Sequence, residues 1–335
     1  MTNSTDSVHA PQRILVCAVA IAAASFGASL TLRGADQIAA AKQGAVKQIV
    51  LLAGRPSHPA GMHEFRAGTM LLQKALSGVP GINVQVFTGG WPRTKNAEGA
   101  DVDDNAPLER ADAILLFSDG GGGNPAIQGE RIKVLDALAA KGVGLGFAHY
   151  AVEVPAGPPA DAMNRWIGGS YESKFSVNPM WAPDFQKFPD HPVTRGVKPF
   201  ATHDEWYFNM RWTADEAQKK RITPILTATP SDDVRDGPYV SPRGPYEHIV
   251  KDSGKVETMM WVIERADGGR GFGFTGGHTH NHWGDPNQRK VMLNALLWLA
   301  KMNVPAGGVV DKITEADLPQ NLDEKGRRGG GGGGR

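Results

Sequence analysis

The chain has 335 residues and a formal net charge of +1, with 41% hydrophobic and 21% charged residues. This length and composition are typical of a globular protein with one large or two small domains. The near-zero charge argues against electrostatic capture of nucleic acid, and no internal stretch is long and apolar enough to span a membrane.

The first 35 residues have the features of a secretory signal peptide. Arg13 precedes the apolar run ILVCAVAIAAASFGASL, and small residues between Ala28 and Ala35 offer a cleavage site. An uncleaved anchor is the alternative. We expect a secreted or periplasmic protein with no stable membrane insertion after cleavage. Because the only cysteine, Cys17, lies in this leader, the mature chain would have no disulfide, thiolate ligand or cysteine nucleophile.

Short apolar runs alternate with helical patterns between residues 46 and 304. We expect strands at 46–53, 82–87, 113–117, 143–147, 222–227, 257–263 and 271–275. Helices are expected from Phe65, from Pro125 and from Pro286, the last with Asp285 as N-cap and Gln288 completing a capping box. This alternation predicts an α/β fold, with a mostly parallel sheet between helices.

Two segments interrupt this pattern. Residues 151–200 are rich in Pro, Gly, Trp and Asn and are expected to cover a site as loops, and a polar, Pro-rich insertion is expected at 230–247. Residues 305–335 are expected to form a polar extension that ends in a disordered Gly-rich tail, Gly329–Gly334.

Polar residues follow several of the expected strands. Arg55 and His58 follow the first strand, Asp119 follows the third, and His149 follows the fourth. In parallel sheets such positions meet in one crevice at the carboxyl edge. The glycines at 120–123 lack the residues of a phosphate loop and the spacing of a dinucleotide fingerprint, so no nucleotide cofactor is expected.

His278, His280 and His282 alternate after a Gly-Gly break. Three imidazoles at this spacing point the same way in an extended segment, and the first and third share a face in a helix. Either geometry would supply ligands to a metal ion, or a base and a donor to a substrate. The alternative is a turn whose polar side chains bond only to backbone.

Asp204 and Glu205 are adjacent acids followed by Trp206 and Tyr207. Adjacent acids are typical of solvated turns, but the aromatic neighbours indicate that one of them, Glu205 in particular, is held partly buried. Four tryptophans can either stack on sugar rings or belong to the core. They are Trp166, Trp181, Trp206 and Trp283.

These motifs together resemble the ThuA-like family, named from trehalose utilisation. The resemblance covers roughly residues 47–304. It rests on six short motifs in order: His58 with His63-Glu64, Gly146-Phe147-Ala148-His149, Asp190-His191-Pro192-Val193-Thr194-Arg195-Gly196, Asp204-Glu205-Trp206-Tyr207, Gly276-Gly277-His278, and Asn294-Ala295-Leu296-Leu297-Trp298. It implies the flavodoxin-like, three-layer fold of class I glutamine amidotransferases. Because Ala148 and His149 stand where those enzymes need a thiolate, glutamine hydrolysis by cysteine is excluded.

The resemblance also implies a role in carbohydrate catabolism. Several members of the family occur beside machinery that oxidises glycosides at C3, and a 3-keto group acidifies the C2 proton. A base with a cation or donor would then suffice for an isomerase, lyase or hydrolase reaction on a small-molecule carbohydrate. The alternatives are a non-catalytic carbohydrate-binding or scaffold protein, and metal storage.

The expected site residues fall into three groups. His149, Glu205 and Asp204 are the catalytic candidates, and His149, Glu205 and His278 share the roles of base, acid and metal ligand in an order that the sequence leaves open. A divalent metal such as zinc would use His278, His280 and His282. Substrate contacts are expected from Arg55, His58, Glu64, Asp119, Trp206, Tyr207 and Trp283.

Overall fold

Apolar runs build a central sheet of seven strands. The structure, a computed structural model, describes residues 45–325, so the expected signal peptide and the Gly329–Gly334 tail lie outside it. The strands are β1 (Lys47–Ala53), β2 (Ile82–Phe87), β5 (Ala113–Phe117), β6 (Gly144–Ala148), β11 (Ile222–Ala228), β12 (Glu257–Glu264) and β13 (Arg270–Phe274). All seven expected strands are present. Five of them begin or end one residue away from the expected position.

The strand order across the sheet is β11-β12-β13-β6-β5-β1-β2. β2, β1, β5, β6 and β13 are parallel neighbours, whereas β12 runs antiparallel to both β13 and β11. The five parallel strands therefore have the flavodoxin-like order 2-1-3-4-5. The expected α/β fold with a mostly parallel sheet is confirmed.

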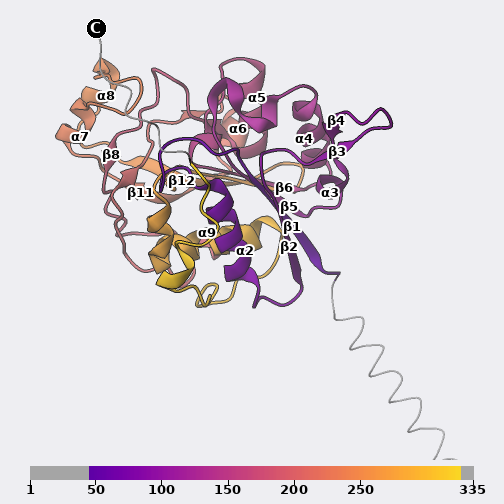
Figure 1. Cartoon of the computed structure of the whole chain (residues 1–335). Helices are drawn as coiled ribbons and strands as arrows, with labels where there is room; N and C mark the ends of the chain where they lie inside the picture. Colours follow the sequence, from indigo (N-terminus) through magenta and orange to yellow (C-terminus); the bar gives the residue numbers. More distant parts are fainter. Residues whose placement is uncertain (1–44, 326–335) are drawn as a thin grey trace, which may run out of the picture. The chain divides into compact units, whose positions relative to one another are not determined.

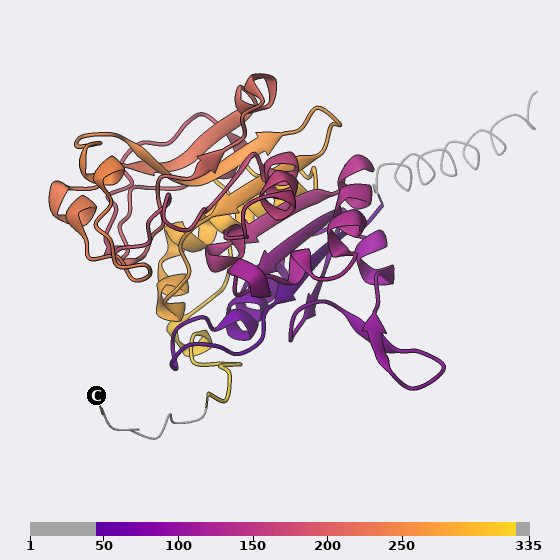
Figure 2. The ribbon, with the colours of Figure 1, turned by 90° about the horizontal axis from the view of Figure 1, so that it is seen from above.

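Side chains of successive residues point to opposite faces of the sheet and therefore pack into two separate hydrophobic cores. In β1, Ile49 and Leu51 enter one apolar cluster, and Val50 and Leu52 enter the other. Helices α2 (Phe65–Leu76) and α9 (Pro286–Leu299) cover the first face, while α4 (Arg131–Ala140) and α5 (Pro158–Ile167) cover the second. Figures 1 and 2 show the sheet between these two helical layers.

Shorter elements complete the layers. The remaining helices are α3 (Ala106–Glu109), α6 (Glu216–Lys219), α7 (Asp232–Asp236) and α8 (Glu247–Val250). Three two-stranded sheets pair β3 (Arg93–Lys95) with β4 (Asp101–Asp103), β7 (Gly169–Ser170) with β10 (Arg211–Trp212), and β8 (Met180–Trp181) with β9 (Asp204–Glu205). The 3-10 turns are η1 (Gly121–Gly123), η2 (Pro125–Ile127), η3 (His149–Val152), η4 (Pro192–Thr194), η5 (His280–Gly284) and η6 (Glu315–Asp317). Within residues 45–325, no helix has the length and apolar character that crossing a membrane requires.

Three expectations need correction. Residues 151–200 are not only loops, because α5 forms there, with Pro158 at its start and Gly168 as a left-handed C-cap. The helix expected from Pro125 is a 3-10 turn there, and α4 begins at Arg131. The capping box at α9 is half formed: Asp285 accepts from the backbone N–H groups of the first turn, but Gln288 bonds Thr202 instead of reaching back.

The segment from 305 to 325 lies against the α/β body. Asn294 accepts from the backbone N–H of Val309 at 2.8 Å, and Arg289 pairs with Asp311 at 3.0 Å. Asn294 and Arg289 both belong to α9, so residues 305–325 pack against the same domain.

Candidate active site

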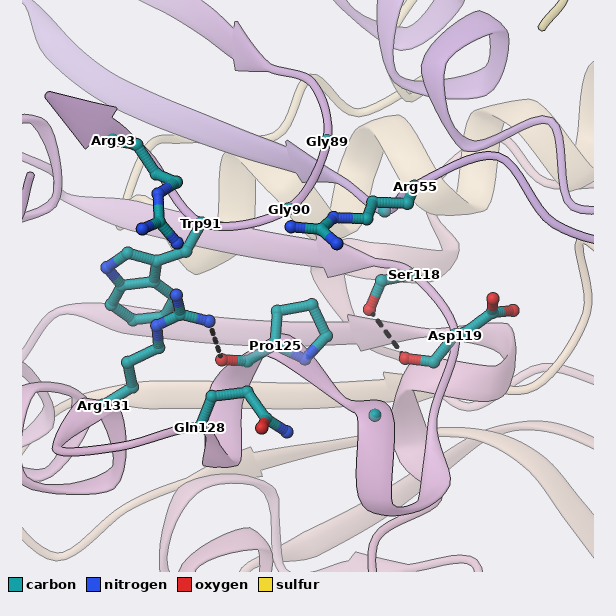
Figure 3. A pocket seen from close by; sticks show the side chains of 12 residues that line it. Arg55, Gly89, Gly90, Trp91, Arg93, Ser118, Asp119, Pro125, Gln128 and Arg131 are labelled. Carbon is teal, nitrogen blue, oxygen red and sulfur yellow. Dashed lines mark hydrogen bonds between the residues drawn. The ribbon is translucent and has the colours of Figure 1, made fainter. Parts of the chain in front are cut away.

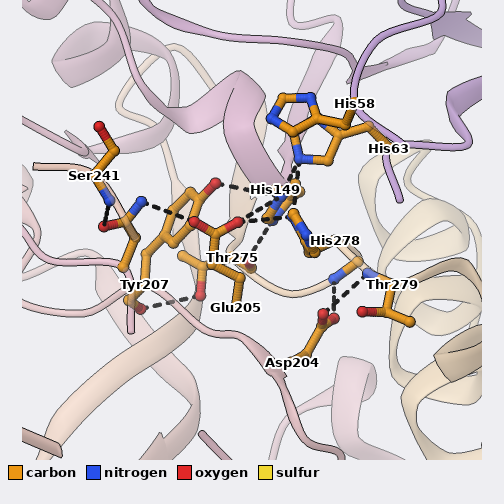
Figure 4. A network of polar contacts seen from close by, with 12 residues as sticks. His58, His63, His149, Asp204, Glu205, Tyr207, Ser241, Thr275, His278 and Thr279 are labelled. Carbon is orange, nitrogen blue, oxygen red and sulfur yellow. Dashed lines mark hydrogen bonds and ion pairs between the residues drawn. The ribbon is translucent and has the colours of Figure 1, made fainter. Parts of the chain in front are cut away.

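Four buried side chains meet at the carboxyl edge of the sheet. His63 follows β1, His149 follows β6, His278 follows β13, and Glu205 lies in the short strand β9. Each of the four contributes one ligand atom, and these atoms all lie within 4.8 Å of one another. We call these residues the histidine cluster; Figure 4 shows their side chains converging.

The contacts inside the histidine cluster are short. His63 Nε2 lies 3.0 Å from His149 Nε2 and 3.0 Å from His278 Nδ1. Glu205 Oε2 lies 2.7 Å from His278 Nδ1 and 3.6 Å from His149 Nε2. A tetrahedral metal ion with bonds of about 2.0 Å keeps its ligand atoms roughly 3.3 Å apart, which matches this spacing.

Hydrogen bonds outside the cluster fix where the ring protons lie. A carbonyl oxygen only accepts, so His149 Nδ1, 3.0 Å from the oxygen of Thr275, carries the proton. His63 Nδ1 donates in the same way to Asp119 Oδ1 at 2.8 Å. In both neutral rings the Nε2 lone pair therefore points into the cluster, the arrangement found when carboxylates and carbonyls orient metal-binding histidines.

The two rings are held in their neutral form. Burial lowers the pKa of His63 to about 4 and that of His149 to about 3, and neighbouring histidines push in the same direction. At neutral pH two lone pairs thus face each other at 3.0 Å. A cation between them removes this repulsion, so the histidine cluster can hold a divalent metal ion.

Backbone strain accompanies these positions. His58, His63 and His149 have φ angles of 59°, 48° and 53°, in the left-handed region that non-glycine residues rarely adopt. His149 occupies the turn directly after β6. Such strain costs on the order of 1–3 kcal/mol per residue and concentrates at functional sites.

A cavity of about 310 Å³ opens beside the histidine cluster. His63, Glu205 and Tyr207 form part of its wall, together with residues from the covering segments. The hydroxyl oxygen of Tyr207 lies 3.2 Å from His149 Nε2. We call this space the reaction cavity; it falls at the lower end of the volumes that small-molecule sites enclose.

The reaction cavity contains acids and donors that the sequence reasoning missed. Burial, together with the charge of Glu205, raises the pKa of Glu153 to about 7, and burial raises that of Tyr150 to about 12. Asn178 donates to Glu205 Oε1 at 2.8 Å. Glu153 stands four residues after His149, but the sequence alone does not distinguish it from a surface acid.

The three alternating histidines do not converge. Gly277 has a φ of 102° and turns the chain, so the segment is neither an extended strand nor an α-helix. His278 enters the histidine cluster, whereas His280 Nε2 donates to the oxygen of Leu318 and His282 faces Asp204 at 3.5 Å. The three side chains therefore do not form a common metal site.

Asp204 stabilises the turn that carries His278. Its buried carboxylate accepts from the backbone N–H groups of Gly277 at 2.8 Å and Thr279 at 3.0 Å. Burial raises its pKa, but the nearby rings of His282 and His149 and the bond from the backbone N–H of Gly277 outweigh burial and hold the pKa below its ordinary value. Asp204 is absent from the wall of the reaction cavity, and its contacts give it a structural role.

Of the two alternatives for the four tryptophans, sugar stacking or the core, their burial favours the core. Trp206 is fully buried and packs against Phe185 and Phe274, and Trp283 is buried beside Phe117. A Cβ at Gly276 would come within 2.4 Å of Trp206, so glycine is required for this packing. Trp166 and Trp181 are buried as well.

The remaining substrate candidates lie in three different places. His58 stacks on His63 with ring centroids 3.6 Å apart and borders the reaction cavity, whereas Arg55 and Asp119 line a second cavity. Glu64 is buried and accepts from the backbone N–H groups of Gly61 and Asp323, both at 2.8 Å. Glu64 therefore stabilises the loop that precedes His63.

A family model described as "ThuA: Trehalose utilisation" matches residues 85–299. The matched part includes His149, Glu205 and His278, while His63 precedes it. A solved ThuA-like protein from Bacteroides uniformis is 16% identical, with a TM-score of 0.52 over 78% of this chain and 95% of its own. An AraC family transcriptional regulator from Pseudomonas putida, 15% identical over 30% of this chain and 64% of its own, has a TM-score of only 0.20 and supports no argument. No curated protein matches the chain.

Proposed function

The chain belongs to the ThuA family, and on that premise we propose that it is a metal-assisted enzyme that removes a proton from a keto sugar. The description of the family, trehalose utilisation, supports a carbohydrate-related role. The observation that carries the finer proposal is the histidine cluster, in which outside hydrogen bonds aim the lone pairs of His63 and His149 at one point.

The donor set suits zinc or a similar divalent ion. Three imidazole nitrogens and one carboxylate oxygen are the ligand types that such ions prefer. A divalent ion held by all four residues would act as a Lewis acid on a substrate carbonyl oxygen by taking that oxygen as a fifth ligand. In this proposal His63, His149, His278 and Glu205 hold the ion, and Asp119 and Thr275 keep the rings in the required tautomer.

The reaction cavity would receive the sugar ring. Tyr150, Asn178 and Ser241 give its wall donors and acceptors suited to hydroxyl groups. Burial raises the pKa of Tyr207 well above its ordinary value, so its hydroxyl stays protonated as a donor.

Glu153 is our candidate for the base. It lines the reaction cavity, and no hydrogen bond or ion pair engages its carboxylate within the described residues. A pKa of about 7 lets it accept a proton at neutral pH and return it. The proton would come from the carbon beside the keto group and leave an enolate. Return of the proton from Glu153 to the former carbonyl carbon, while the C2 hydroxyl proton passes to the C3 oxygen, shifts the ketone to C2. Alternatively, the C1 substituent, β to the carbonyl, leaves as an alcohol that takes the proton from Glu153, and this gives an elimination product.

We place this chemistry outside the cytoplasm on the strength of the leader-like first 35 residues. Expression of the full chain in a bacterial host, followed by fractionation and N-terminal sequencing, tests this placement. A mature N-terminus between residues 28 and 36 in the periplasm supports export, and an intact leader in the cytoplasm contradicts it.

Proton abstraction itself can be tested in deuterated water. The purified protein is incubated with a panel of glycosides and their 3-keto forms, with and without chelator, and NMR follows loss of the C2 proton signal. We expect exchange or product only with a keto form, and only with metal present. A matched variant, His248→Ala, removes an exposed histidine and should stay active. No exchange with any keto sugar, while sugar affinity persists, would instead favour a non-catalytic binding protein.

A further inference from the structure

A second cavity of about 460 Å³ lies at the same edge of the sheet. It is formed where β1, β2 and β5 end, by Arg55, by the turn that contains Trp91 and Arg93, and by Asp119. Gln128 and Arg131 close it from the start of α4. We call it the arginine cavity; Figure 3 shows Arg55 at one end and Arg93 and Arg131 at the other.

The arginine cavity carries excess positive charge. Arg131 is neutralised by Asp103 through two bonds of 2.7 Å. Arg93 donates only to the backbone oxygen of Asp101, and Arg55 has no hydrogen bond or ion pair with any residue in the described range. Two guanidinium groups are thus available to a ligand, and both side chains are exposed to solvent.

The one carboxylate in the wall, that of Asp119, offsets part of this positive charge. Asp119 Oδ1 accepts from His63 Nδ1 at 2.8 Å and lies 3.8 Å from His58 Nδ1. Because His63 is neutral, this contact leaves the negative charge on Asp119. Arg55, Arg93 and Arg131 against Asp103 and Asp119 still give the arginine cavity a net charge of +1. Asp119 lines the arginine cavity and His63 lines the reaction cavity, so these two residues in contact separate the two cavities.

We propose that the arginine cavity binds the oxyanion of an acidic sugar unit, a carboxylate or a phosphate, which belongs to the same substrate as the keto sugar. This inference rests on the proposed function, which puts the reacting ring in the reaction cavity. Guanidinium groups bind both anions through paired hydrogen bonds. Trp91 and Gln128 supply an apolar wall and a polar group beside them, so the preferred substrate is an acidic glycoside in place of a neutral disaccharide.

Binding can be tested without turnover, by titration calorimetry with D-glucuronate, D-glucose 6-phosphate and D-glucose. Because anions also bind metals, the titrations use chelated protein in a His149→Ala background. We expect at least one acid to bind at least tenfold more tightly than glucose, and more weakly as salt rises. The two acids distinguish a carboxylate site from a phosphate site.

Two variants locate the site. Arg55→Gln and Arg93→Gln should each lower the affinity for the preferred acid about tenfold. Arg110→Gln is the matched control, because this exposed arginine precedes β5 and so lies at the opposite edge of the sheet. Equal affinity for glucose and both acids would overturn the proposal, as would unchanged acid binding in Arg55→Gln and Arg93→Gln. Failure of proton exchange with keto sugars would instead refute the proposed function, and these titrations do not depend on it.

Discussion

His63 and His149 face each other through their Nε2 atoms at 3.0 Å, although both ring protons are committed to acceptors on the far sides of the rings. Two unprotonated nitrogens at this distance repel each other unless a positive charge lies between them.

Removing a member of the histidine cluster should abolish tight metal binding. We expect the wild type, loaded with zinc and dialysed, to keep about one equivalent by elemental analysis, and His63→Ala to keep none. His248→Ala should behave like the wild type, because His248 is exposed and bonds only the backbone of Phe175. Equal zinc content in His63→Ala and wild type would show that the cluster is not the site.

Asp119 should matter for metal affinity without touching the metal. Asp119→Ala frees the ring of His63 to change tautomer, and losing such a partner typically costs about 10–100-fold in affinity. Competition with a fluorescent zinc chelator measures the change. An affinity within a factor of two of wild type would mean that packing alone orients the ring.

Acid should destabilise the metal-free protein. The folded-state pKa values of His63 and His149, about 4 and about 3, lie below the ordinary value of 6.5. The unfolded state therefore binds more protons, and stability present above pH 6.5 is lost as pH falls toward 4, at up to about 1.4 kcal/mol per pH unit for each histidine. Urea unfolding in chelator at pH 7, 6 and 5 measures this slope. His149→Gln should flatten it, and a slope identical to that of wild type would contradict the assignment.

Activity should depend on Glu153 and rise with pH near neutrality. As a base, Glu153 works only when ionised, so turnover of a keto substrate should increase as pH passes about 7 and then level off. Glu153→Gln should lower kcat at least a hundredfold while far-UV circular dichroism stays unchanged. Retention of the wild-type pH profile in this variant would assign the base elsewhere.

Asp204 should contribute to stability more than to chemistry. In Asp204→Asn one amide oxygen must replace two carboxylate oxygens that accept from Gly277 and Thr279. We expect a loss of about 1–3 kcal/mol in the free energy of unfolding, the usual cost of an unsatisfied buried group. Activity per folded molecule should fall much less than in Glu153→Gln. A fully stable but inactive Asp204→Asn would restore Asp204 as a catalytic residue.

The central sheet could be predicted because its signal is local. Each strand is a short β-branched or apolar run, and the alternation with helices implies parallel order. Helix α5 was missed because Pro158-Pro159 and Gly168 looked like loop residues, although proline at a helix start and glycine at its end are regular boundary signals.

The site was only partly predictable. His149 and His278 could be predicted as site residues because they follow strands, and the topology of a parallel sheet places the ends of its strands together. The roles of Asp204 and Trp206 depend on their contacts with the distant turn at Gly276-Gly277, and no local periodicity predicts such contacts. Glu153 could not be distinguished from a surface acid without its burial.

The contact of Glu64 with the backbone of Asp323 has a practical consequence for anyone who expresses this protein. Lys325 adds an ion pair to Glu64 at 3.2 Å and also donates to the backbone oxygen of His63. Truncation of the protein before residue 323, or fusion of a rigid partner there, would remove or disturb these contacts. The loop that carries His63, some 260 positions earlier in the sequence, would then be less stable. Affinity tags are therefore better placed at the other end of the folded unit, ahead of Lys47.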